Sequence, residues 1–167
     1  MERVKELYQV YERYIFQYLY GLTFDYHVAE ELTQETFYQI LKAIPGFRGD
    51  CHVSTWIYKI ARNLYCGWRR KKTFTTVSID AGTYDFSNGE SPEDILERKE
   101  KHKLIKQAFQ KLPEKYREVL WLRDWQELSY AEIAAVTNHS IPWVKVNIHR
   151  ARLAFKKYFL ERSALNE

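Results

Sequence analysis

The sequence predicts an all-α protein made of two small helical domains joined by a flexible linker. Glycine and proline are scarce, at six and four of 167 residues, and strand-like alternation is hard to find. Apolar residues instead recur at spacings of three and four along most of the chain. Residues 73–90 lose this periodicity and are rich in Thr, Ser, Gly, Asp and Asn, which is typical of a linker.

Three helices are predicted in the N-terminal domain, residues 1–72. The first covers about the first twenty residues, and the second runs from about residue 26 to 42. The segment "AIPGFRGDCH" then breaks the pattern with its proline and glycines. Ser54 or Thr55 is predicted to cap a third helix, which carries large aromatics and ends in four consecutive cations, "RRKK".

Four helices are predicted in the C-terminal domain, residues 91–167. Ser91 as N-cap and Pro92 at the first helical position favour a helix start there. Two helices are expected at about 91–111 and 113–125, separated at "LPEK". The capping box "SYAE" begins the third of these helices at Ser129, and Ser140 is predicted to cap the last.

Composition and cysteine usage narrow the class of protein. With 46% hydrophobic and 29% charged residues, the chain can bury a core. Two cysteines make no disulfide framework, which favours a reducing compartment. No apolar run approaches the ~20 residues that span a bilayer, and "MERVKELYQ" lacks the apolar centre of a signal peptide. We therefore expect a soluble cytoplasmic protein.

Charge is unevenly distributed along the chain, although the net charge is only +4. Residues 14–41 contain acids but no Lys or Arg, whereas residues 43–79 contain seven cations against Asp50 alone. Residues 133–160 contain no acid. Basic surfaces are typical of nucleic-acid binding, and an acidic helix suits a protein partner. The distribution therefore predicts two kinds of partner.

A helix-turn-helix is the most specific local signal. After "SYAE", a short helix, a four-residue turn and a longer acid-free helix follow one another. Ala134 is small enough for a close helix crossing, and Asn138 can adopt the left-handed turn conformation. The second helix would enter the major groove of DNA with its N-terminal residues at the base edges. The alternative is a plain helix pair whose cations face solvent.

Catalytic and metal sites are not expected. Cys51, His52 and Cys66 lack the paired spacing of a zinc site. The chain has no Gly-rich phosphate loop, nucleophile elbow or candidate triad. We predict no enzyme, no cofactor, no metal and no small-molecule substrate. A nucleic-acid enzyme that uses Asp50 and His52 is a weaker alternative.

Three blocks of sequence carry a family resemblance: "DYHVAEELTQETFYQI", "FRGDCHVSTWIYKIARNLYCGWRRKK" and "LPEKYREVLWLRDWQELSYAEIAAVTNHSIPWVKVNIHRARLAF". In this order they resemble the extracytoplasmic-function (ECF) class of bacterial sigma factors, compact two-domain members of the housekeeping-type sigma family. The resemblance implies a factor that binds core RNA polymerase and directs promoter-specific transcription initiation. A stand-alone dimeric helix-turn-helix regulator is the alternative.

The resemblance implies roles for both parts of the N-terminal domain. The acidic helix would dock on core RNA polymerase through five residues: Asp25, Glu30, Glu31, Gln34 and Glu35. A solvated acidic face is the bland alternative. The loop and third helix would hold the melted −10 strand by aromatic stacking and cations. The residues expected there are Phe47, Arg48, Asp50, Trp56, Lys59, Arg62, Asn63, Arg69 and Arg70. Trp56 alternatively packs behind the loop and shapes it.

The C-terminal domain would read the −35 duplex. The residues expected to contact it are Ser140, Pro142, Trp143, Lys145, Asn147, His149, Arg150 and Arg152. Asn147 suits an adenine, and Trp143 either meets a thymine methyl or sugar face or turns inward. The resemblance further implies promoter DNA and an anti-sigma factor, often membrane-anchored in relatives, as partners. The active protein would be nucleoid-associated.

Overall fold

The computed structural model describes residues 2–72 and 92–165. All regular secondary structure in these two ranges is helical, which confirms the predicted all-α fold class. The predicted linker and the proposed Ser91 cap lie outside the described residues. Below, residues 2–72 are called the N-terminal module and residues 92–165 the C-terminal module.

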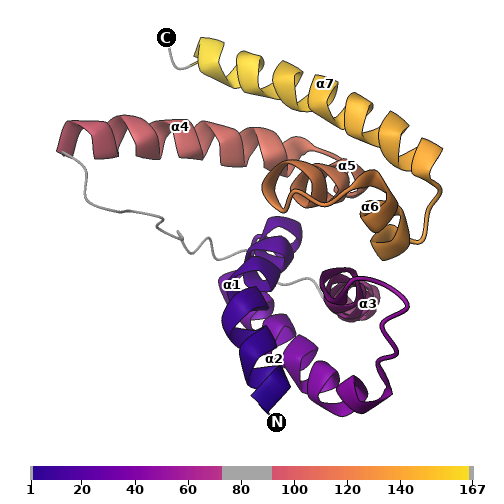
Figure 1. The fold of residues 1–167 in the computed structure, drawn as a ribbon. Helices are drawn as coiled ribbons and strands as arrows, with labels where there is room; N and C mark the ends of the chain where they lie inside the picture. The colour runs from indigo at the N-terminus through magenta and orange to yellow at the C-terminus, as the bar shows by residue number, and fades with distance from the viewer. Residues whose placement is uncertain (1, 73–91, 166–167) are drawn as a thin grey trace.

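The N-terminal module is a bundle of three long helices (Figure 1). Its elements are α1 (Glu2–Thr23), α2 (Tyr26–Ala43), a short 3₁₀ helix η1 (Ile44–Gly46) and α3 (Val53–Lys72). Asp25 is the N-cap of α2, and its Oδ1 accepts a hydrogen bond from the Val28 backbone N–H at 3.1 Å. The centre of the bundle is apolar and buried, and includes Ile15, Leu19, Ile40, Ile57 and Ala61.

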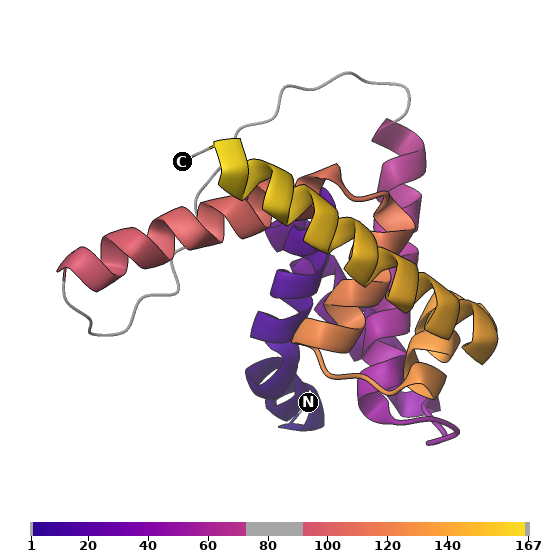
Figure 2. The same ribbon diagram turned by 90° about the horizontal axis from the view of Figure 1, so that it is seen from above.

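The C-terminal module contains α4 (Pro92–Lys111), α5 (Glu114–Leu120), the π-helical segment η2 (Trp121–Trp125), α6 (Tyr130–Thr137) and α7 (Ile141–Leu165). The long helix α7 packs along both α4 and α5 (Figures 1 and 2). Its buried residues at the α5 and α6 end, Val144, Ile148 and Ala151, follow the three- and four-residue spacing of one helix face. This packing fixes the orientation of the helix-turn-helix.

Helix ends follow the predicted chemistry at three places. The capping box at Ser129 and Glu132 forms both of its hydrogen bonds, and Ser140 Oγ accepts from the Trp143 backbone N–H at 3.2 Å. Asn138 adopts the left-handed conformation, with φ 58° and ψ 40°. These observations confirm the predicted connection between the two helices of the helix-turn-helix. Helix α4 begins at Pro92, as predicted.

The predicted cap of the third helix is wrong. Helix α3 already begins at Val53, so Ser54 and Thr55 lie inside its first turn. The Trp56 backbone N–H donates to the His52 carbonyl at 3.1 Å. Since the helical hydrogen bonds begin at His52, neither hydroxyl is placed at the cap position.

The two modules pack against each other, a question that the sequence left open. Phe24 at the end of α1 meets Phe109 of α4 edge to face, with ring centroids 6.2 Å apart. Gly21 of α1 lies beneath the Trp121 ring, and a Cβ added there would be 3.0 Å from that ring. The buried apolar residues of both modules form one continuous cluster. The core therefore extends across the module boundary.

Candidate nucleic-acid interface and protein-docking face

The acidic helix α2 exposes three of its five predicted docking residues. Glu30, Glu31 and Gln34 are exposed, on the side away from the buried Leu32 and Phe37. The other two have partners within the chain. Asp25 caps the helix, as described above, and Glu35 accepts a hydrogen bond from Gln39 Nε2 at 2.7 Å. The free acidic surface is therefore smaller than the sequence predicted.

The loop before α3 is built on an aromatic contact. Phe47 lies against Trp56, with ring centroids 4.7 Å apart and an interplanar angle of 32°. Gly49 has a φ of 78°, a conformation that L side chains rarely adopt. Arg48 and Asp50, on either side of this glycine, are both exposed. Trp56 thus packs behind the loop, which is one of the two predicted alternatives, and the loop presents its charged residues outward.

Two stripes of polar residues run along α3 and face different ways. Lys59, Asn63 and Arg70 are exposed and spaced by four and seven residues, so they share one face of the helix. Arg62 and Arg69 lie on a second face, which meets α5 of the C-terminal module. The sequence had placed all five residues on a single DNA-binding surface. The structure leaves the first stripe open, whereas on the second Arg62 is half-buried and Arg69 is exposed but ion-paired.

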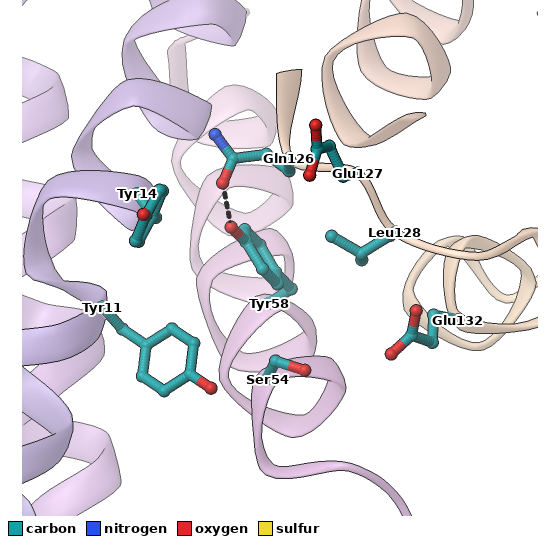
Figure 3. A pocket seen from close by; sticks show the side chains of 8 residues that line it. All are labelled: Tyr11, Tyr14, Ser54, Tyr58, Gln126, Glu127, Leu128 and Glu132. Carbon is teal, nitrogen blue, oxygen red and sulfur yellow. Dashed lines mark hydrogen bonds between the residues drawn. The ribbon is translucent and has the colours of Figure 1, made fainter. Parts of the chain in front are cut away.

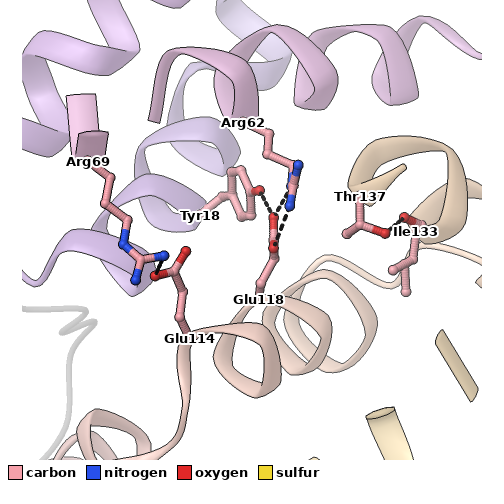
Figure 4. A network of polar contacts seen from close by, with 7 residues as sticks. All are labelled: Tyr18, Arg62, Arg69, Glu114, Glu118, Ile133 and Thr137. Carbon is pink, nitrogen blue, oxygen red and sulfur yellow. Dashed lines mark hydrogen bonds and ion pairs between the residues drawn. The ribbon is translucent and has the colours of Figure 1, made fainter. Parts of the chain in front are cut away.

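Glu118 of α5 joins three helices through its carboxylate (Figure 4). Its Oε1 accepts hydrogen bonds from Arg62 Nε at 2.6 Å and from the Tyr18 hydroxyl at 2.8 Å. Arg62 Nη2 also donates to Oε2 at 3.4 Å. One turn earlier on α5, Glu114 forms an ion pair with Arg69. Arg62 is therefore largely covered by its contact with α5, with 22% of its side chain exposed, whereas Arg69 is paired with Glu114 but keeps 58% of its side chain exposed.

Burial and pairing shift the pKa values of this cluster. Burial raises the pKa of Tyr18 well above 10, and the charge of Glu118 and its hydrogen bond raise it further. Burial lowers the pKa of Arg62, but the hydrogen bond and charge of Glu118 outweigh it, so the net shift is upward. Both shifts keep the cluster in one protonation pattern, a neutral phenol and a guanidinium cation around the carboxylate.

A second contact between modules borders an open cleft of about 200 Å³ (Figure 3). The Tyr58 hydroxyl of α3 donates to Gln126 Oε1 at its edge. The lining residues are Tyr11, Tyr14, Ser54 and Tyr58 from the N-terminal module and Gln126, Glu127, Leu128 and Glu132 from the C-terminal module. The cleft therefore lies between the two modules.

The recognition helix α7 presents a mixed surface. The exposed side chains at its cap and on its first three turns include Ser140, Pro142, Lys145, His149 and Arg150. Asn147, in contrast, is 4% exposed, and its Nδ2 donates to the Trp143 carbonyl at 2.8 Å. Its predicted contact with adenine is therefore wrong for this conformation, because the amide bonds back to the preceding turn. Arg152 is half exposed and pairs with Asp124 at 2.6 Å.

Trp143 is neither fully outward nor fully inward. It is half-buried, and its ring stacks on His139 in the turn, with centroids 3.6 Å apart and an interplanar angle of 12°. His139 itself is exposed. The two rings together therefore form one face at the start of the recognition helix.

Sequence reasoning missed the residues that join the modules: Tyr18, Glu114, Glu118 and Gln126. One signal was available. Glu118 stands directly before an apolar run, "VLWL", and Glu114 precedes it by one turn. These two acids pair with two cations that lie seven residues apart on α3. The pairing can be recognised only when the packing of the two modules is known. The pattern alone therefore did not identify them.

Within 2–72 and 92–165, no three His, Cys, Asp or Glu side chains gather as a metal ion would require. In the same ranges, no helix is long and apolar enough to cross a membrane.

The described residues form helices with a helix-turn-helix, an exposed basic stripe on α3 and an acidic face on α2, which together define a DNA-binding protein with a second, protein-directed surface. The model of sigma-70 region 2 matches residues 7–75, and the model of sigma-70 region 4 matches residues 102–155. The chain is 37% identical to the RNA polymerase sigma factor YlaC of Bacillus subtilis (strain 168) over 163 residues, which cover 93% of this chain and 91% of YlaC.

Two further relatives agree. The chain is 34% identical to the ECF RNA polymerase sigma factor SigW of the same organism, over 91% of this chain and 86% of SigW. It is 33% identical to the RNA polymerase sigma-H factor of Pseudomonas aeruginosa, over 88% and 81%. The chain belongs to the sigma-70 family, as a sigma factor of the ECF type, and directs promoter-specific transcription. The term "housekeeping-type" described this family inaccurately.

Solved structures show the same fold at lower sequence identity. The sigma factor RpoE, in complex with the anti-sigma factor NepR from Bartonella quintana, aligns with a TM-score of 0.78 at 18% identity, over 95% of this chain and 97% of that one. CnrH in complex with the cytosolic domain of CnrY aligns with a TM-score of 0.67 at 21% identity, over 94% and 88%. The fold of this chain is therefore also that of RpoE and CnrH in those complexes.

Proposed function

We propose that this chain binds core RNA polymerase through α2 and recognises a promoter through both modules. The N-terminal module holds the melted −10 strand, and the C-terminal module reads the −35 duplex through α7. The division of labour follows the predicted domains, residues 1–72 and 91–167. The carrying observation is that the matches to regions 2 and 4 coincide with an exposed acidic face and two exposed basic faces. The chemistry belongs to the polymerase, so the chain itself needs no catalytic residues.

The −10 site is proposed to work in two stages. Arg48, Lys59, Asn63 and Arg70 are already exposed, so they can contact a strand backbone while the modules are packed together. Arg62 becomes available only when α5 and Glu118 move away, and the same movement frees the exposed Arg69 from its ion pair with Glu114. Free protein should therefore bind promoter DNA weakly, and the polymerase complex should bind it more tightly.

An anti-sigma factor is a further proposed partner. The two solved neighbours named above are each complexes, one with NepR and the other with the cytosolic domain of CnrY. A similar inhibitor for this chain would act in the bacterial cytoplasm, where we place the protein, and would keep it from the nucleoid until released.

Polymerase docking is tested by reversing charge on the exposed acidic face. In Glu30→Lys/Glu31→Lys, both changed residues are exposed and leave the Asp25 cap and the Glu35 pair intact. We expect tight binding of purified bacterial core polymerase by the wild type and a loss of about tenfold or more in the variant, or about 1.4 kcal/mol. The measurement is equilibrium binding with labelled protein.

The matched control is Glu2→Lys/Glu6→Lys, which makes the same charge change at exposed positions of α1. Binding by this control should equal that of the wild type. If both variants bind core polymerase as tightly as the wild type, α2 is not the docking face. No polymerase binding by the wild type, together with tight binding of a duplex by the free chain, would support the stand-alone regulator instead.

A further inference from the structure

The start of the recognition helix presents apolar side chains at positions where a helix in the major groove meets the base edges. Ile141 is 41% exposed and Val146 is 46% exposed. Pro142 between them is also exposed. In a helix-turn-helix, the N-terminal residues of the second helix are those that contact the bases. This end of α7 therefore offers the groove a surface made largely of hydrocarbon.

Hydrogen-bonding groups on the same turns are mostly used within the chain. The Asn147 amide is buried and donates to the Trp143 carbonyl, and Ser140 Oγ caps the helix. Among residues 140–147, all of which the structure describes, Lys145 carries the only exposed ionisable group. Adenine is commonly recognised by an exposed Asn or Gln and guanine by Arg or Lys. Of these types, only Lys145 is available here.

The His139–Trp143 stack adds a fixed wall to this surface. The ring centroids lie 3.6 Å apart and the planes are within 12° of parallel. His139 is held by the left-handed turn at Asn138, and its backbone N–H donates to the Ala134 carbonyl at 3.1 Å. The stack therefore holds the indole against a neighbouring ring before DNA binds, which lowers the cost of ordering it on binding.

We propose that α7 reads the −35 duplex chiefly by apolar contact with thymine methyl groups, made by Ile141, Val146 and a Trp143 ring that His139 positions. The thymine C5-methyl is the apolar group that a base pair displays in the major groove. A hydrocarbon surface gains free energy by covering it, while a cytosine at the same place offers no methyl group. The inference rests on the proposed function and states how its −35 site distinguishes thymine from the other bases.

The test compares thymine with uracil, because replacing thymine by deoxyuridine removes the methyl group and leaves base pairing unchanged. The −35 sequence is first selected from a randomised library with the complex of full-length chain and bacterial core polymerase. We expect the selected site to contain at least two thymines, counting both strands. Deoxyuridine at these positions should then weaken binding about fourfold for each methyl group in contact. The same replacement in the DNA between the −35 and −10 elements should have no effect.

Variants assign the effect to residues. The quantity compared is the ratio of the affinities for thymine-containing and uracil-containing DNA. Val146→Ala and Trp143→Ala should each bring this ratio close to one at a single base position. His139→Ala should do so indirectly, whereas His139→Phe, which keeps a ring to stack, should restore the ratio. Leu153→Ala removes an exposed apolar side chain farther along α7, 57% exposed, and should leave the ratio unchanged.

The outcomes separate the two proposals. If the complex forms and selects a −35 site but tolerates uracil everywhere, or selects a site without thymines, methyl recognition is wrong and the proposed function stands. The same holds if 7-deazaguanine, which lacks the N7 acceptor, weakens binding more than uracil does. If no complex with polymerase forms, or no site is selected, both proposals fail.

Discussion

Glu118 shows how one side chain can connect two modules. A carboxylate that is removed from water is stable only when it is paired and hydrogen-bonded. Its two partners, Tyr18 and Arg62, come from α1 and α3, so the cluster is complete only when the modules are packed together. The contact that satisfies Glu118 is therefore also the contact that occupies Arg62.

Alkaline pH should expose the contribution of Tyr18. Its folded-state pKa is raised above the ordinary value of 10, so the unfolded chain loses this proton first as the pH rises. The stability linked to the neutral phenol is present below about pH 10 and is lost as the pH rises through the folded-state pKa. Tyr18→Phe has no phenol to titrate at this position. The fall of its unfolding free energy with pH above pH 10 should therefore be shallower than that of the wild type by about 1.4 kcal/mol per pH unit. Urea unfolding at a series of alkaline pH values measures it.

Glu118→Gln separates the two causes of that shift. Burial is the larger cause and remains in this variant, whereas the charge of Glu118 is lost. We therefore expect the unfolding free energy of Glu118→Gln to fall with pH above pH 10, as in the wild type, but over a narrower pH interval. Equal slopes for the wild type and Tyr18→Phe would show that the phenol keeps its proton no better in the folded chain.

At the scale of elements, the helices were predictable and their contacts were not. Apolar spacing and cap residues depend on neighbours within a few positions, so "SYAE" and Asn138 were enough to place the helix-turn-helix. The two stripes of α3 are chemically alike, and only the packing of α5, which begins at Glu114, gives Arg62 and Arg69 their carboxylate partners. Asn147 was misplaced for a similar reason, because sequence does not reveal a bond back to the preceding turn.

Two helical glycines should respond oppositely to the same substitution. Gly67 in α3 has open space around a new Cβ, so Gly67→Ala should stabilise the chain by about 0.5–1 kcal/mol through helix propensity. At Gly21, a Cβ would lie 3.0 Å from the Trp121 ring, which is tighter than ordinary contacts. Gly21→Ala should therefore lose that gain or become destabilising. Thermal unfolding of both variants checks this, and equal stabilisation would mean that the α1–η2 contact yields easily.

At the scale of the whole molecule, the packed arrangement and the proposed function require different geometries. On straight B-DNA, elements centred about 25 base pairs apart are separated by about 85 Å, at about 3.4 Å per step. In the structure, the modules that would read them are joined by an Arg62–Glu118 contact of 2.6 Å. The proposed function therefore requires the two modules to separate before one chain can engage both elements.

Reversing the charge of Glu118 should open the free chain. Glu118→Arg places two guanidinium groups where a carboxylate and a guanidinium now meet, and leaves the Tyr18 hydroxyl without its acceptor. We expect a larger radius of gyration by small-angle X-ray scattering with unchanged helix content by circular dichroism. Adding Arg62→Glu restores opposite charges across the interface and should bring the radius back toward that of the wild type.

Glu127→Arg is the matched control for this opening, because it makes the same charge change at an exposed residue that lines the nearby cleft. Its radius of gyration should equal that of the wild type. A compact Glu118→Arg chain would mean that the apolar contacts of Phe24 and Trp121 hold the modules together without the ionic cluster. An open chain that closes again in the charge swap would make this cluster the element that polymerase binding has to displace, since the same arginines are proposed to hold the −10 strand.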